Sequence, residues 1–238
     1  MPNGREKASF HRHTMRSPNP FEKEEVALRY HQWYERPPGS TLASLEKKAL
    51  AHLLSPLQKG SLLEVGCGTG YFTAWLAELG FAVVGLDRSL PMLKAARQRY
   101  TEIPFLLGSG ESLPFLTHSF GVVAFLTSLE FIACPKIALR EASRVAKKAI
   151  MLGVINRGSP YLLYRRLRKR SPYHQARLYS IAELKDLLRS CLDRPFRVTW
   201  ATAILSPRWG YAPSRLPAGG FIAMRVDFQD DPRPSGKP

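Results

Sequence analysis

Cysteines and acidic residues are both scarce in this chain of 238 residues. The three cysteines, Cys67, Cys134 and Cys191, are far apart and form no C-x-x-C pair, which argues against a disulfide framework and against a cysteine zinc site. We therefore expect a reducing, cytoplasmic location and no bound metal. Acidic residues number 19 against 35 Lys and Arg, and the net charge of +16 favours phosphates, anionic membranes or acidic small molecules as partners.

Long hydrophobic runs are also missing. The most apolar stretch, residues 121–134, is interrupted by polar side chains and is too short to span a bilayer. Residues 1–20 lack the apolar segment of a secretory signal, so they are expected to form a flexible basic arm, and residues 229–238 a disordered tail. With 45% hydrophobic and 23% charged residues, the chain has the composition of a soluble or peripheral globular protein.

Hydrophobic periodicity predicts two helices, at residues 21–34 and 42–54, followed by short β-rich runs that alternate with helical patterns. This alternation is typical of a parallel sheet covered by helices. A later helix starts after Ser180, which has capping-box spacing with Glu183, and two final β-rich runs are expected to pair antiparallel. The predicted strands are residues 61–66, 82–87, 105–107, 122–127, 149–155, 196–205 and 221–228, and the predicted helices between them are 72–79, 91–100 and 136–146.

A glycine-rich turn, residues 66–70, connects the first predicted strand to a helix. Glycines there allow positive φ and close approach of a ligand, and the helix start offers unpaired N–H groups, so the turn suits an adenosine-bearing cofactor. Tyr71 stands where a dinucleotide fingerprint needs its third glycine, and no Gly-Lys-Ser/Thr of a P-loop is present. Asp87 ends the next strand, about 20 residues on, where a carboxylate can bind both ribose hydroxyls.

These residues resemble the class I S-adenosylmethionine-dependent methyltransferases, in particular a prokaryotic subgroup, without an assigned substrate, of the type 11 methyltransferase domain family. The resemblance to the family rests on four segments in its order: residues 64–70, 85–93, 111–115 with 119–120, and 140–145. The resemblance to the subgroup rests on residues 30–34 and 171–180. It implies an α/β fold with three layers, Rossmann-like, in which a mostly parallel seven-stranded sheet has its last strand antiparallel. We expect one methyltransferase domain over residues 21–228, with a helical cap at 21–58, a cofactor-binding core at 59–155 and a basic lid insertion at 156–180.

The same resemblance implies an enzyme with S-adenosylmethionine as cofactor. Gly66, Gly68 and Gly70 are expected at the methionine moiety and Asp87 at the ribose. Leu86 is expected beside the adenine. The full set of cofactor-binding candidates is Glu64, Gly66, Cys67, Gly68, Gly70, Asp87, Arg88, Leu90, Ser109, Gly110, Glu111 and Thr127.

Three positions depart from the family's pattern. Ser109 replaces an acid that often binds the adenine amine, Gly121 replaces an Asp, and Lys147–Lys148 replace a Pro-Gly-Gly turn. A non-catalytic cofactor-binding or interaction protein with a degenerate site is therefore one alternative, since fold alone does not imply activity.

Methyl transfer is an in-line displacement that requires alignment and exclusion of water, and a base is needed only when the acceptor must lose a proton. Catalytic candidates are His174, Tyr179 and Glu130, and candidates for the substrate site or lid are Tyr30, Trp33, Tyr34, Ser128, Asn156 and Arg177. Core packing is the alternative for the aromatic residues, and a capping or solvated carboxylate is the alternative for Glu130.

A small apolar or anionic molecule is the expected methyl acceptor. The basic run at residues 161–170 leaves two other partners open, RNA and an anionic membrane surface, because basic and aromatic residues interleave there. An RNA methyltransferase is thus the alternative within the same class of enzyme.

Overall fold

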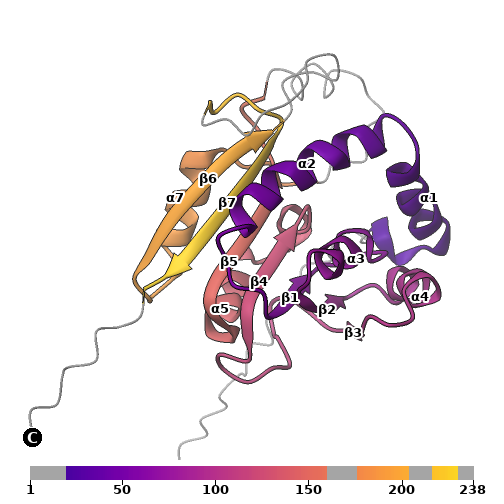
Figure 1. The fold of residues 1–238 in the computed structure, drawn as a ribbon, viewed down its shortest axis with the longest axis horizontal. Coiled ribbons are helices and arrows are strands. Elements are labelled where there is room, and N and C mark those ends of the chain that lie inside the picture. Colours follow the sequence, from indigo (N-terminus) through magenta and orange to yellow (C-terminus); the bar gives the residue numbers. More distant parts are fainter. Residues whose placement is uncertain (1–19, 160–175, 204–215, 230–238) are drawn as a thin grey trace, which may run out of the picture.

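A computed structural model of the chain describes residues 20–159, 176–203 and 216–229. Its centre is a seven-stranded sheet in the order β3-β2-β1-β4-β5-β7-β6 (Figure 1). The first five strands of that order are parallel, and β7 pairs antiparallel with both β5 and β6, which confirms the predicted fold class. In chain order the strands are β1 (Ser61–Val65), β2 (Ala82–Asp87), β3 (Phe105–Leu107), β4 (Phe120–Leu126), β5 (Ala146–Ile155), β6 (Phe196–Ala203) and β7 (Phe221–Phe228).

Helices cover both faces of the sheet, because its central strands are buried on both sides and present apolar residues in an almost continuous run. Leu62 of β1 packs with the residues under α2 and α3, whereas the next residue, Leu63, packs with those of α5 and α7. None of the described helices is long and apolar enough to cross a membrane. The helices are α1 (Glu24–Glu35), α2 (Gly39–Leu54), α3 (Tyr71–Glu78), α4 (Leu90–Arg99), α5 (Pro135–Val145) and α7 (Ile181–Arg189), with 3-10 turns η1 (Pro20–Glu22) and η2 (Leu129–Phe131).

Helix α1 forms a cap that packs against α4, α2 and η1 (Figure 1). The ring of Tyr34 stacks on Tyr71 at the start of α3, with 4.3 Å between the ring centroids. His31 Nδ1 lies 3.1 Å from the Thr69 hydroxyl, a contact buried from solvent. These contacts hold α1 over the glycine-rich turn that follows β1.

Two strands begin earlier than their patterns predict. The prediction for β4 starts at residue 122 and that for β5 at 149, but the strands begin at Phe120 and Ala146. The reason is that Gly121 and the exposed Lys147 and Lys148 interrupt the apolar pattern near these amino ends, while Phe120 and Ala146 are buried. The Gly121 N–H donates to the Ser61 hydroxyl at 3.0 Å. The predicted capping box at the start of α7 is confirmed. Two predicted segments lie partly outside the described residues: the lid, at residues 160–175, and the strand 196–205, at its end.

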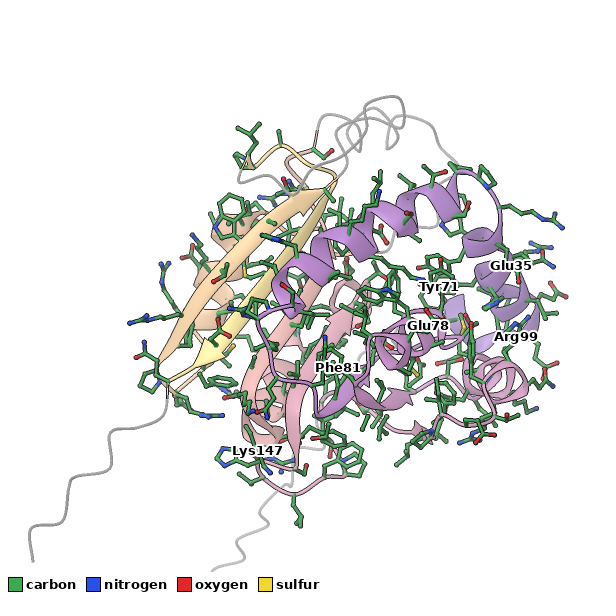
Figure 2. The ribbon with its side chains drawn as sticks, in the orientation of Figure 1. Glu35, Tyr71, Glu78, Phe81, Arg99 and Lys147 are labelled. Atoms are coloured by element: carbon green, nitrogen blue, oxygen red, sulfur yellow. The ribbon has the colours of Figure 1, made fainter. Side chains whose placement is uncertain are left out.

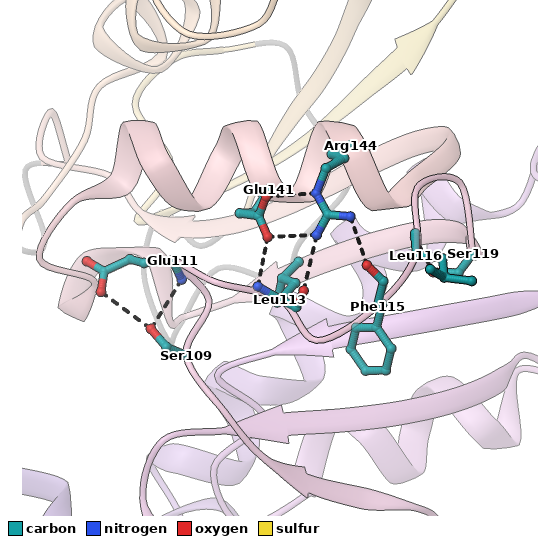
Figure 3. Close-up of polar contacts among 8 residues, drawn as sticks. All are labelled: Ser109, Glu111, Leu113, Phe115, Leu116, Ser119, Glu141 and Arg144. Atoms are coloured by element: carbon teal, nitrogen blue, oxygen red, sulfur yellow. Dashed lines mark hydrogen bonds and ion pairs between the residues drawn. The ribbon is translucent and has the colours of Figure 1, made fainter.

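A network around Arg144 ties α5 to the loop between β3 and β4 (Figure 3). The guanidinium donates to the carbonyl oxygens of Phe115 at 2.8 Å and Leu113 at 3.1 Å, and it pairs with Glu141 at 2.8 Å. Glu141 in turn accepts from the Leu113 N–H at 2.8 Å. The pairing lowers the pKa of Glu141 from its ordinary value. These contacts fix the loop on α5, the helix that follows β4 and η2.

We expect the Arg144→Gln variant to be destabilised by about 1–3 kcal/mol, because two carbonyl oxygens and a carboxylate lose their donor together. Urea unfolding of both proteins measures this difference. Arg140→Gln, at an exposed position of the same helix, is the matched control and should change stability by less than about 0.5 kcal/mol. Equal effects of the two substitutions would show that the network contributes no more than a solvated arginine.

Candidate active site

A pocket lies at the carboxyl ends of β1, β2 and β4 and encloses about 700 Å³, counting the part open to solvent. Strands β1 and β4 are neighbours whose following connections run to opposite halves of the sheet, so the pocket is at the topological switch point, where ligands bind in open α/β sheets. It is lined by Phe21, Tyr30, Val65, Gly66, Gly68, Leu86, Asp87, Arg88, Met92, Gly108, Ser109, Gly110, Glu111, Thr127, Ser128, Phe131, Ile132 and Ala133.

Glycine is required where the turn after β1 meets the end of β4. Gly66 has a φ of +75°, and a Cβ atom placed on it would lie 2.4 Å from the Cβ of Ser128. The Ser128 hydroxyl donates to the Val65 carbonyl at 2.6 Å, so the two strand ends are bound together at this point. Thr127 also has a positive φ of 51°, an outlier for a β-branched residue of the kind that gathers at functional sites.

Asp87 connects the two turns that border the pocket. One carboxylate oxygen accepts from the Gly68 N–H and the other from the Ser89 N–H, each at 2.8 Å. Burial raises the pKa of Asp87, and the two backbone donors oppose that rise. Each carboxylate oxygen can accept more than one hydrogen bond, and Asp87 lines the pocket, as a ligand for two adjacent hydroxyl groups requires.

The opposite end of the pocket is formed by the loop after β3. Ser109 accepts a hydrogen bond from the Glu111 N–H at 3.2 Å, and Glu111 accepts from the Cys134 N–H at 2.7 Å. Among the three departures from the family's pattern, only Ser109 is therefore at the pocket. Gly121 and Lys147–Lys148 lie at the amino ends of their strands, and Figure 2 shows Lys147 far from Glu35 on the cap helix.

Aromatic side chains close the pocket from the side of η1 and α1. The ring of Phe21 makes edge-to-face contacts with Tyr30 at 5.6 Å and with Phe131 at 5.0 Å between centroids. The Tyr30 and Tyr34 hydroxyls are 3.0 Å apart. Burial raises the pKa of Tyr30 to about 12, so its hydroxyl stays protonated at neutral pH.

The structure brings together ten of the residues that the sequence predicted for the site. Eight of them were cofactor-binding candidates, and Tyr30 and Ser128 were substrate candidates. The ten are Gly66, Gly68, Asp87, Arg88, Ser109, Gly110, Glu111, Thr127, Tyr30 and Ser128, and Leu86, which was expected beside the adenine, lines the pocket as well.

Four other cofactor-binding candidates do not line the pocket. Cys67 points into a cluster with Leu93 of α4, and a Cβ on Gly70 would lie 2.9 Å from the Phe105 ring, so both allow helices and strands to pack closely. Leu90 begins α4 and is 46% exposed. Glu64 faces α3, where it accepts from the Thr73 hydroxyl at 2.6 Å.

Three predicted substrate or lid residues are also placed elsewhere. Trp33 packs against Gly39 at the start of α2, and Tyr34 lies behind Tyr30, stacked on Tyr71. The Asn156 amide donates to the carbonyl oxygens of residues 217 and 219 and accepts from the N–H of residue 158, so it holds the segment before β7 instead of facing the pocket.

The catalytic candidates Glu130 and Tyr179 lie together, next to the pocket wall. Arg177 donates its N–H to the Glu130 carbonyl at 2.9 Å, and its exposed side chain lies beside Tyr179. Tyr179 bridges to Asn156 at the end of β5. His174 lies outside the described residues.

Sequence reasoning missed the apolar part of the site. Phe21, Phe131 and Ile132 line the pocket but belong to no motif, and Met92 lies in the segment 85–93 without having been a candidate. These four residues meet from three separate segments. Phe21 fell in the predicted first helix, where its helical spacing was the one available signal.

The fold and the pocket together define an α/β protein of the Rossmann-like class with a pocket at the β1–β4 switch. A family model described as a methyltransferase domain matches residues 63–151. The chain is 30% identical to the demethylmenaquinone methyltransferase of Corynebacterium kroppenstedtii over 194 residues, which cover 76% of this chain and 81% of that protein. The chain therefore belongs to the class I S-adenosylmethionine-dependent methyltransferases.

Solved structures share the fold. An S-adenosylmethionine-dependent methyltransferase of Thermotoga maritima, described as a possible histamine N-methyltransferase, superposes with a TM-score of 0.66 at 27% identity, covering 87% of this chain and 98% of that one. Magnesium protoporphyrin IX methyltransferase of Synechocystis, solved with bound S-adenosylhomocysteine, has a TM-score of 0.65 at 16% identity and covers 88% of this chain and 96% of its own.

Glu64 makes the stability of the folded protein depend on pH. Its side chain is almost fully buried, and burial raises its pKa to about 8; the Thr73 hydrogen bond opposes the rise and Asp87 adds to it. The folded protein then holds this proton more tightly than the unfolded chain, so stability falls as pH rises from about 4.5 to about 8.

We expect Glu64→Gln to be more stable than the native protein at pH 8, by on the order of a few kcal/mol, and equal to it near pH 4.5. Glutamine keeps an acceptor for Thr73 but carries no charge. Thermal unfolding between pH 5 and 8 measures the growing difference. The exposed Glu102→Gln variant is the control. If the stability difference between Glu64→Gln and the native protein stayed constant over this pH range, the Glu64 carboxyl would not have a raised pKa.

Proposed function

We propose that the protein transfers the methyl group of S-adenosylmethionine to a small-molecule acceptor, with the cofactor in the pocket at the β1–β4 switch. The observation that carries this proposal is Asp87: a buried carboxylate at the end of β2 that lines the pocket beside Gly66 and Gly68. The bound S-adenosylhomocysteine of the Synechocystis enzyme supports the choice of cofactor.

The residues present fit this cofactor. Asp87 would accept from the two ribose hydroxyls, and Leu86 and Met92 offer an apolar surface to a base. Ser109 and the N–H groups of the loop after β3 would serve the adenine edge. When bound, S-adenosylmethionine supplies a methyl group activated by a positively charged sulfur. The chain itself orients this group and excludes water with the aromatic rings of Phe21, Tyr30 and Phe131.

Similarity to known methyltransferases does not identify the methyl acceptor, because their names indicate different acceptors: demethylmenaquinone for one and, as a possibility, histamine for another. The sequence predicts an apolar or anionic acceptor. The apolar lining of Phe21, Phe131 and Ile132 supports the first property. The basic run at 161–170, on which RNA or membrane binding depends, lies outside the described residues, and no described feature favours those alternatives.

Calorimetric titration with S-adenosylhomocysteine tests the proposal. We expect micromolar binding to the native protein, about −8 kcal/mol, and at least tenfold weaker binding to Asp87→Asn, because an amide cannot accept hydrogen bonds on both of its terminal atoms. Asp193→Asn, at an exposed position, is the matched control and should bind like the native protein.

Incubation of the native protein with radiolabelled S-adenosylmethionine and a fractionated small-molecule extract measures turnover as S-adenosylhomocysteine formed. Binding without any turnover would favour the non-catalytic alternative. If the folded native protein did not bind S-adenosylhomocysteine, or if folded Asp87→Asn bound it as tightly as the native protein, the proposed cofactor site would be refuted.

A further inference from the structure

Glu130 carries a buried carboxylate oxygen that nothing in the described part of the chain satisfies. Its side chain is 2% exposed. One oxygen, Oε1, accepts from the Ile155 N–H at 2.8 Å, while the other, Oε2, has no hydrogen-bond partner among the described residues. An unpaired buried carboxylate oxygen is costly, so this atom is a place where a ligand donor can bind.

This oxygen lies next to the wall of the cofactor pocket. Glu130 belongs to η2, between Ser128 and Phe131, which both line the pocket. The hydroxyls of Thr127 and Tyr179 are also buried, and neither has a partner with hydrogen-bond geometry among the described residues. Buried polar groups therefore gather at the carboxyl ends of β4 and β5, beside the pocket. Thr127 interacts with Tyr30 and Tyr179 with Arg177, which leaves Oε2 of Glu130 as the buried carboxylate oxygen without a donor among the described residues.

The charges around this position are negative. Glu46 of α2 faces Glu130, whose charge raises the pKa of Glu46. The charges of both carboxylates also raise the pKa of Tyr30, which lines the pocket. No Lys, Arg or His of the described residues is among the groups that set the pKa of Glu46 or Glu130. The cation beside Tyr179, Arg177, is exposed. In a chain with a net charge of +16, this local surplus of carboxyl groups is a specific feature.

We infer that Glu130, with Glu46 facing it, forms the subsite for the acceptor's nucleophile, and that the acceptor is an amine. This inference rests on the proposed methyl transfer. An ammonium group donates N–H bonds to the free Oε2 and neutralises a carboxylate, whereas an anionic acceptor meets only repulsion there. Burial raises the pKa of Glu130 to about 7, close to the value that suits a base at neutral pH.

The chemistry balances with Glu130 as the base. The carboxylate removes one proton from the ammonium, and the electron pair so freed on nitrogen forms the new N–CH₃ bond. The C–S bond breaks and its electron pair stays on sulfur, giving S-adenosylhomocysteine. The product leaves as the methylated ammonium, and the proton stays on Glu130 until it passes to solvent.

Three probes of similar size and different charge test the inference by calorimetry on the protein saturated with S-adenosylhomocysteine: benzylamine, benzyl alcohol and benzoate. We expect benzylamine to bind at least tenfold more tightly than the other two. The preference should disappear in Glu130→Gln, which keeps an acceptor for the Ile155 N–H, while the affinity for S-adenosylhomocysteine stays unchanged. Glu25→Gln, at an exposed position of the cap helix, should keep the preference.

Glu46→Gln is a second test in case Glu130→Gln does not fold. The described residues make no hydrogen bond to the Glu46 side chain, so this substitution removes a charge and no hydrogen bond. It should weaken benzylamine binding severalfold. The inference is overturned by equal or tighter binding of the alcohol or benzoate, by a preference that survives both substitutions, or by no binding of any probe. Loss of S-adenosylhomocysteine binding in the native protein is a different result, which refutes the proposed function itself.

Discussion

The arrangement of the site depends on one buried carboxylate at the end of a strand. Asp87 accepts from the backbone on both sides, from Gly68 in the turn after β1 and from Ser89 at the start of α4. Two turns that are 19 and 2 residues away in sequence are thereby fixed with respect to each other. Without this acceptor two N–H groups would be left without their partner at the pocket, and the glycine-rich turn would be held to β2 only by the N–H groups of Gly66 and Cys67, which donate to the Leu86 carbonyl. The ligand site and the local fold therefore share the same interaction.

A second constraint is the placement of negative charge. The surface is strongly basic, yet Glu64, Asp87 and Glu130 are buried at the carboxyl edge of the sheet. Burial raises the pKa of each of them, which means that the fold holds these charges at a cost in stability. Such costs are typical of functional sites, where perturbed carboxyls are poised to bind or to exchange a proton. A cationic sulfur and an ammonium acceptor would both be attracted to this edge.

The sequence predicted the fold well because parallel strands of this kind leave clear marks. The bounds of the parallel strands β2 and β3 agree with apolar runs that end at Asp87 and before Gly108, and the antiparallel β7 also has its predicted bounds. Within the site, motif spacing predicted Gly66, Gly68 and Asp87, but it could not tell which neighbours face the ligand. Cys67 and Gly70 alternate with pocket residues and point into helix packing instead. Phe21 and Phe131 are 110 residues apart and meet only through the tertiary fold, so no local pattern could associate them. The free oxygen of Glu130 likewise depends on contacts that only the folded chain defines.

The most direct test of this account is a crystal structure of the protein with S-adenosylhomocysteine. We expect the ribose hydroxyls on the Asp87 carboxylate, the adenine against the loop of Ser109 to Glu111, and the sulfur on the side of the pocket that Thr127 and Tyr30 line, next to Glu130. A molecule bound with its ribose away from Asp87, or at another place on the protein, would contradict it.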